Sequence, residues 1–175
     1  MDRAIQVRER GLGDTPSIEH IYLAAFPDED LLPVVRELLR ETRGVLSLVA
    51  VSDDAVVGHV VFTICTVADG AGAVALLAPL AVLPGWQGQD VGSAIVGEGC
   101  RRMEEVGVDW VYVLGDPGYY GRFEFAADDG VDPPYPLPAE WRAAWQSLGL
   151  GERAVPARGK LWVPQPWRQE NLWSA

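Results

Sequence analysis

The chain has 175 residues, of which 49% are hydrophobic and 22% charged, so it is long enough to bury a core within one globular domain. Its 25 acidic residues outnumber the 14 Lys and Arg residues, and the net charge of -11 has the wrong sign for binding nucleic acid or an anionic membrane. Cys65 and Cys100 lie far apart and in no CxxC pair, which excludes a disulfide scaffold and a zinc cluster. We therefore expect a cytoplasmic protein without a metal site.

The N-terminal part predicts one strand followed by two helices. The first residues, MDRAIQVRERG, are too charged for a signal peptide, and apolar and polar residues alternate there as in a half-buried strand. Apolar residues then recur with helical spacing over 18–25, where Thr15 can cap the helix and Pro16 suits its first turn. A second helical pattern covers 31–39 and follows three acidic residues at 28–30.

The middle of the chain predicts three strands and a helix. Apolar β-rich runs cover 47–51, 55–67 and 74–82, and a turn at Asp53 and Asp54 separates the first two, so we expect an antiparallel meander. A turn rich in Gly and Gln follows, and then a helix that ends at Val106.

The pattern next predicts a strand over 110–114 and a short helix over 119–123, which Asp116 can cap before Pro117. The element order is therefore β-α-α-β-β-β-α-β-α. We expect residues 131–175 to be a Pro- and Trp-rich extension that packs on the core of a single domain spanning 1–175, because they are too few to hold a core of their own.

Within this extension, the segment PPYPLP at 133–138 favours extended backbone. Trp141, Trp145 and Leu148 have the spacing of one helix face, so a short helix is predicted from Pro138. Residues 160–163 are typical of a last strand.

Residues 76–99, LLAPLAVLPGWQGQDVGSAIVGEG, predict a buried strand, a Gly- and Gln-rich turn, and a helix. Backbone N–H groups of such a turn, with the positive end of the next helix, can hold a pyrophosphate without any basic side chain. The same residues also suit an ordinary turn that needs Gly for its backbone angles. Three antiparallel strands precede the turn and G-K-[ST] is absent, which argues against a Rossmann turn and a Walker loop.

Two motifs make the chain resemble the GNAT family of N-acetyltransferases. The family signature Q/R-x-x-G-x-G/A, between the fourth strand and the third helix, is matched by QGQDVG at 87–92. LGDPGYYGRFEF at 114–125 is similar to the family's fifth strand, its short helix with a Tyr, and its G-F ending. With the PYPLP segment, the chain is most similar to a bacterial branch of these acetyltransferases. The resemblance implies an α/β fold with a mixed, splayed, mostly antiparallel sheet flanked by helices.

The resemblance also implies an acetyl-CoA-dependent N-acetyltransferase, in which a primary amine of a small molecule or peptide attacks the acetyl thioester directly. Tyr120 matches the general acid that protonates the leaving thiolate, and Tyr119 is the neighbouring alternative. The family binds pantetheine on the backbone of the fourth strand and pyrophosphate on the turn, and the matching residues here are Leu80, Ala81, Val82, Gln87, Gly88, Gln89, Asp90, Val91 and Gly92. A second copy of the chain, in a homodimer, is a further potential partner.

The chain departs from the family pattern at two glycines. Asp90 stands at the first Gly of the turn motif, and Glu124 stands at the Gly of the G-F ending. A carboxylate at position 90 can cap the helix N–H groups that a pyrophosphate would use and repel the phosphates. Alternatively, its side chain points to solvent and changes little. These departures favour an alternative function, a non-catalytic CoA-binding or regulatory module on the same fold. A third alternative is a protein-interaction domain that uses the Trp-rich C-terminus. His59 is expected to be a packing residue.

Overall fold

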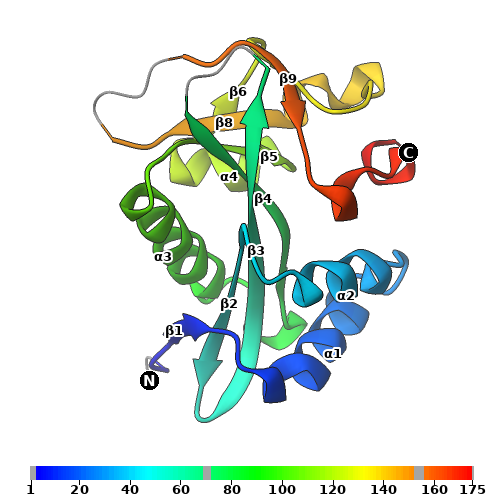
Figure 1. The fold of residues 1–175 in the computed structure, drawn as a ribbon. Coiled ribbons are helices and arrows are strands. Elements are labelled where there is room, and N and C mark those ends of the chain that lie inside the picture. The colour runs from blue at the N-terminus through cyan, green and yellow to red at the C-terminus, as the bar shows by residue number, and fades with distance from the viewer. Residues whose placement is uncertain (1–2, 69–71, 152–155, 175) are drawn as a thin grey trace. The chain divides into compact units, whose positions relative to one another are not determined.

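The computed structural model describes residues 3–68, 72–151 and 156–174 (Figure 1). The chain divides into two compact units, one of Met1–Phe62 with Ala78–Gly99 and the other of Thr63–Leu77 with Cys100–Ala175. Three long elements contribute to both units: strand β3 (Ala55–Val67), strand β4 (Ala73–Val82) and helix α3 (Val91–Glu105).

The strands of the first unit form the predicted antiparallel meander. β1 (Gln6–Glu9) pairs antiparallel with β2 (Val45–Ser52), and the first part of β3 and the end of β4 follow in that order. Asp53 and Asp54 join β2 to β3 with φ values of 49° and 63°, which are the left-handed angles that a tight two-residue hairpin requires.

Helices α1 (Thr15–Ala25) and α2 (Leu32–Arg40) lie on one side of these strands and α3 lies on the other (Figure 1). Thr15 is the first residue of α1, so the cap predicted at Thr15 is wrong by one position. Asp14 precedes the helix, and its carboxylate accepts from the Gly11 backbone N–H at 2.7 Å. One buried cluster joins both helices to the strands: Ile18, Ile21, Tyr22, Val35, Val49 and Ala81.

Two glycines let α3 approach β3 closely. A methyl group on Gly58 would lie 2.9 Å from Cγ1 of Val91, the first residue of α3, and one on Gly99 would overlap the ring of Phe62. Any side chain at either position would push the helix away from the strand. Gly58 therefore lets the N-terminus of α3 lie close to β3, and Gly99 does the same for the middle of the helix.

The second unit is built around β5 (Val108–Leu114), which pairs in parallel with the start of β4. On its other edge β5 pairs antiparallel with β8 (Trp145–Gly149), and β8 pairs with the two-residue strand β6 (Ala126–Ala127). The helix predicted from Pro138 through Leu148 is therefore wrong. Residues 139–144 form a 3-10 helix, and the chain then becomes a strand because β5 offers it a full row of backbone partners.

The predicted last strand is present as β9 (Gly159–Trp162), which pairs antiparallel with the end of β3 and in parallel with β7 (Val131–Asp132). Two short 3-10 helices follow, Gln165–Trp167 and Glu170–Trp173. Trp173 contacts the rings of both Trp145 and Trp167. Residues 152–155 and 175 of the predicted extension lie outside the described residues.

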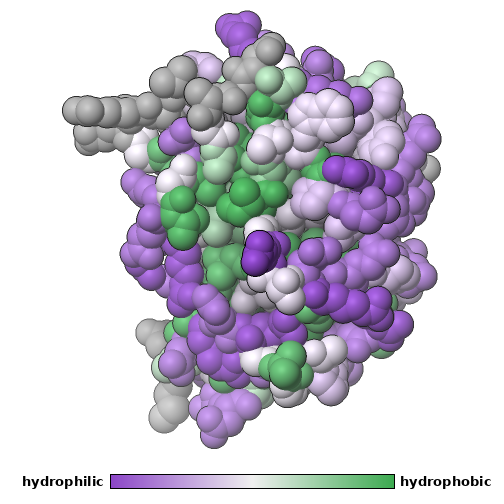
Figure 2. Space-filling view, viewed as in Figure 1, coloured by the Kyte–Doolittle hydropathy of each residue, from purple (hydrophilic) through white to green (hydrophobic). Residues whose placement is uncertain are grey.

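The strands are mostly antiparallel and helices flank them, which confirms the predicted α/β fold class. Hydrophilic residues cover much of the face in Figure 2, as the charge content of the chain requires, and hydrophobic residues gather over a smaller area. Among the described residues, no helix combines the length and the apolar character that crossing a bilayer demands.

Candidate active site

The turn after β4 is held by its own side chains. A 3-10 turn (Pro84–Trp86) leads into residues 87–90, which are all exposed. The side-chain amide of Gln87 donates to the carbonyl of Val82 at 3.1 Å, and that of Gln89 donates to the carbonyl of Gly85 at 2.9 Å. Gln87 thus braces the turn against the end of β4, and Gln89 braces it internally, against the 3-10 turn.

The start of α3 presents open backbone donors. The first hydrogen bond of the helix runs from the Ala94 N–H to the Asp90 carbonyl, at 3.0 Å. The N–H groups of Val91, Gly92 and Ser93 precede that bond, so they have no acceptor within the helix, and the helix dipole makes this end positive. No Lys or Arg occurs in residues 76–99. The turn therefore fits an anionic group such as a pyrophosphate, bound through backbone donors. The Arg3 guanidinium also lies at this turn, 4.7 Å from the centroid of the Trp86 ring.

Asp90 and Glu124 keep the backbone conformation that the missing glycines would adopt. Asp90 has a φ of 64° and Glu124 a φ of 73°, both in the left-handed region that favours glycine. The two substitutions therefore alter side chain and charge while the turn geometry is retained. The structure gives the Asp90 carboxylate no hydrogen bond to any described residue and leaves Asp90 exposed, so of the two alternatives for this side chain it favours the one that faces solvent over the helix cap.

The predicted pantetheine-binding residues lie at the end of β4. Ala81 is buried, and Leu80 and Val82 are half-buried. The pairing of β4 with β5 covers Ala73 to Leu76, so these three residues lie beyond that register. They are continuous with the turn, and all nine predicted cofactor-binding residues thus belong to the first unit.

Tyr120 belongs to the second unit and ends the short helix α4 (Pro117–Tyr120). As predicted, Asp116 caps this helix, and its carboxylate accepts from the Gly118 N–H at 2.9 Å. The Tyr120 ring is buried between Tyr119 and Phe125, whose ring centroids lie 5.0 and 5.7 Å away. Burial, with a smaller contribution from Tyr119, raises the pKa of Tyr120 above its usual value. Its hydroxyl makes no hydrogen bond to the described part of the chain.

Known proteins similar to this chain belong to the same family that the motifs at 87–92 and 114–125 resemble. The profile described as Acetyltransferase (GNAT) family matches residues 15–118, more than half of the chain. The chain is 32% identical to the uncharacterized N-acetyltransferase YjhQ of Escherichia coli over 160 residues, which cover 87% of this chain and 88% of the relative. The chain belongs to the GNAT family. It is thus an N-acetyltransferase of the class that takes acetyl-CoA as its acyl donor.

Solved structures of GNAT proteins share the fold of this family member. YhbS of Escherichia coli in complex with CoA is similar with a TM-score of 0.85 and 26% identity, covering 95% of this chain and 93% of that one. A GNAT acetyltransferase from Brucella melitensis in complex with acetyl-CoA is similar with a TM-score of 0.74 and 26% identity, covering 94% and 99%.

The GNAT fold here also contains a buried polar chain that sequence reasoning did not find. His59 on β3 is fully buried, with Nδ1 2.8 Å from the Tyr22 hydroxyl and Nε2 2.7 Å from the Ser47 hydroxyl. Burial lowers the pKa of His59 to about 3, so the imidazole is neutral, and two hydroxyls satisfy both ring nitrogens. The structure thus supports the expected packing role of His59.

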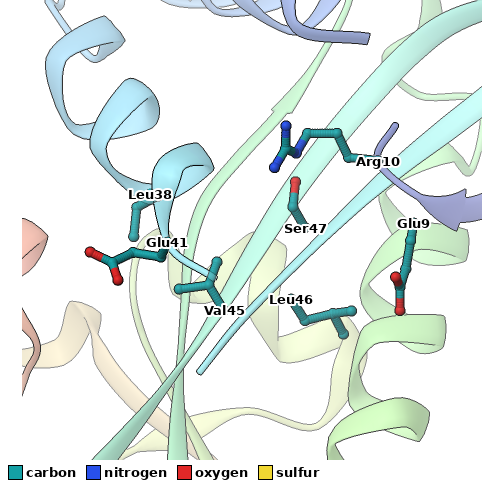
Figure 3. Close-up of a pocket in the computed structure, with 7 residues that line it drawn as sticks. All are labelled: Glu9, Arg10, Leu38, Glu41, Val45, Leu46 and Ser47. Atoms are coloured by element: carbon teal, nitrogen blue, oxygen red, sulfur yellow. The ribbon is translucent and has the colours of Figure 1, made fainter. Parts of the chain in front are cut away.

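Ser47 reaches the wall of a small cavity of about 130 Å³. Figure 3 shows the side chains of Ser47 and Arg10 directed toward the same region of it, with Glu41 directed away. Arg10 donates to the Leu39 carbonyl at 2.9 Å, while its buried Nε has no hydrogen-bond partner among the described residues. This cavity lies at the start of β2, at the opposite end of that strand from the hairpin at Asp53.

The two cysteines of the chain are poor candidates for a catalytic nucleophile. Burial raises the pKa of both Cys65 and Cys100 to about 12, so their thiols stay protonated and are poor nucleophiles. Within the described ranges, no three His, Cys, Asp or Glu side chains gather as metal ligands would.

Proposed function

We propose that this protein transfers the acetyl group of acetyl-CoA to a primary amine, on a small molecule or a peptide, by direct attack of the amine on the thioester. Family membership supports the reaction class. A new C–N bond forms, the C–S bond breaks, and the amine loses a proton while the departing thiolate gains one. The protein then has to orient the two reactants and supply that proton.

In this proposal the turn and the start of α3 bind the pyrophosphate of CoA. The observation that carries it is the row of N–H groups on Val91, Gly92 and Ser93, which have no acceptor within the helix and follow directly on an exposed turn that Gln87 and Gln89 brace. The backbone of Leu80, Ala81 and Val82 would hold the pantetheine arm, since these residues lie beyond the register with β5. The YhbS and Brucella neighbours, crystallised with CoA and acetyl-CoA, support this use of the fold.

Tyr120 is the proposed general acid. Burial keeps its phenol protonated at physiological pH, and the hydroxyl has no partner among the described residues that would compete for its proton. Tyr119 is the weaker alternative, because its ring already packs under the Arg122 guanidinium, 4.6 Å from the ring centroid. A positioned acid of this kind contributes about 10²–10⁴ in rate.

Two measurements, first of binding and then of activity, test the proposal. Acetyl-CoA at one hundred times its dissociation constant should stabilise the fold by about 2.7 kcal/mol, measured as a shift of the melting temperature. A panel of amines is then screened for release of the CoA thiol. The proposal would be overturned if millimolar acetyl-CoA neither shifts the melting temperature nor gives a heat of binding in a calorimetric titration. Binding without turnover on any amine would favour the non-catalytic CoA-binding module.

We further propose that the protein acts in the cytoplasm as one GNAT domain, with residues 131–175 packed on its core. Two unpaired thiols, of which Cys65 is buried and Cys100 half-buried, support a reducing compartment. The pairing of β8 with β5 supports the packing of the extension. A homodimer is the remaining proposal, and light scattering of the purified chain tests it.

A further inference from the structure

We propose that residues 144–146, in the C-terminal part of the chain, position the Tyr120 phenol by fixing the backbone of Gly115, on which the phenol ring rests. The inference rests on the proposed function, because it assigns a role to Tyr120 as the acid. It gives this C-terminal segment a role in positioning the proposed acid.

The ring of Tyr120 lies directly over Gly115. A methyl group on Gly115 would lie 2.5 Å from Cε2 and 3.0 Å from Cδ2 of the ring, which is closer than real contacts allow. Any side chain at position 115 must therefore displace the ring. The backbone N–H of Tyr120 is held by the Asp116 carbonyl at 3.0 Å, so the displacement falls on the side chain.

Gly115 is itself held from both sides by the segment that begins β8. Its N–H donates to the Ala144 carbonyl at 3.0 Å, and its carbonyl accepts from the side-chain amide of Gln146 at 3.0 Å. The same amide nitrogen also donates to the Ala144 carbonyl, at 3.2 Å. Gln146 is one of the few buried polar residues of the chain, and both of its donors serve this connection.

Residues 144–146 are in turn immobilised by Trp145, which lies opposite Leu114 in the β5–β8 register. Its indole N–H donates to the Val131 carbonyl at 2.8 Å, and its ring stacks on Tyr112 with centroids 5.6 Å apart. A glycine has the greatest backbone freedom of any residue, so these outside contacts determine where Gly115 lies. A misplacement of about 1 Å at a reacting group can cost 10²-fold in rate. Loss of the contacts that hold Gly115 should therefore lower the rate of acetyl transfer.

Gly115→Ala and its matched control Gly121→Ala test the proposal. Gly121 sits one residue beyond Tyr120, and a methyl group there meets nothing within 4 Å. The first readout is the ¹³Cζ resonance of Tyr120 in tyrosine-labelled protein, assigned with Tyr120→Phe. We expect Gly115→Ala to shift that resonance, because the ring must move, while Gly121→Ala leaves it unchanged. This readout needs no amine acceptor.

The second readout is kinetic, with the acceptor found in the amine screen. Gly115→Ala should lower kcat by about 10- to 100-fold with KM for acetyl-CoA within twofold, and Gly121→Ala should match the wild type. Combined with Tyr120→Phe, Gly115→Ala should add no further loss, because the positioned group is already gone. Gln146→Met, which keeps the length of the side chain and removes both donors, should shift the resonance and lower kcat in the same direction.

The outcomes separate this inference from the proposed function. Full activity of Tyr120→Phe overturns the acid assignment. A large loss in Tyr120→Phe, together with an unshifted resonance and a normal kcat in Gly115→Ala, overturns the positioning inference alone. If Gly115→Ala does not fold, Gln146→Met decides, and an unchanged resonance and kcat in that variant contradict the inference.

Discussion

Replacing Asp90 by glycine should strengthen CoA binding, and it should do so without destabilising the protein. The carboxylate stands at the end of the turn proposed for the pyrophosphate, directly before α3; residues 76–99 contain no Lys or Arg, and the nearby Arg3 guanidinium packs on the Trp86 ring, 4.7 Å from its centroid. At about 5 Å a pair of like charges repels by roughly 1 kcal/mol in water and about 3 kcal/mol at an effective dielectric of 20. Asp90 is exposed, so we expect the lower end, about fivefold in the dissociation constant.

The effect on stability follows from the backbone. The carboxylate caps no N–H group of the described chain, so its removal costs no hydrogen bond. The φ of 64° carries a left-handed penalty of roughly 1–2 kcal/mol for an ordinary residue, less for Asp, against about 0.5–1 kcal/mol for the greater freedom of glycine in the unfolded chain. The free energy of unfolding should therefore stay constant or rise by up to about 1 kcal/mol.

Two further variants separate charge from backbone. Asp90→Asn removes the charge and keeps the side-chain shape, so it should reproduce the gain in affinity. Glu124→Gly relieves the same strain at a φ of 73° outside the turn, so it should raise stability and leave CoA affinity unchanged. Calorimetric titration at low and high ionic strength is the assay, and the gain from Asp90→Asn should shrink in about 1 M salt, where the screening length is about 3 Å. An unchanged affinity of Asp90→Asn at low salt would refute the reasoning.

The remaining predictions concern other parts of the chain. Tyr120→Phe should retain acetyl-CoA affinity and lower kcat by about 10²–10⁴, with a smaller loss in Tyr119→Phe, and equal losses would reassign the acid. Because the folded pKa of His59 is about 3 against 6.5 in a free side chain, its contribution to stability is complete above pH 6.5 and is lost as the pH falls toward 3. Urea unfolding should show a loss of about 2 kcal/mol between pH 7 and pH 5 that is absent in His59→Gln, while His20→Gln, an exposed control, behaves as wild type. Truncation after Asp129 removes β8, the neighbour of β5, and should yield insoluble or destabilised protein; an equally stable monomer would contradict the packing of residues 131–175.

Local patterns were sufficient for much of the fold and for the family. The strand predicted over 55–67 has those limits in the structure, and the second helix and the β4 strand agree within a residue. Their apolar spacing repeats over many residues, so local propensity and core burial favour the same conformation. The turn motif at 87–92 and the Tyr motif at 114–125 also indicated the family, because both depend on a few residues close together in the chain.

The segment 145–149 shows why local patterns were insufficient elsewhere. Trp141, Trp145 and Leu148 have the spacing of a helix face, yet pairing with β5, whose residues lie more than 30 positions earlier, makes the segment a strand. The buried chain from Tyr22 through His59 to Ser47 likewise joins residues from three elements, and no signal in the sequence predicts it.

The sequence by itself determined the fold class, the family and the residue types of the turn, since each follows from periodicity or from a short motif. Only the tertiary structure decided that Asp90 and Glu124 keep left-handed backbone in place of glycine, and that Gly115 carries the Tyr120 ring. The physical reason is the same in both cases. A glycine or a left-handed residue has no single preferred backbone conformation by itself, so its conformation is set by the hydrogen bonds and packing of the folded chain, which for Gly115 come from Ala144 and Gln146, about 30 residues away.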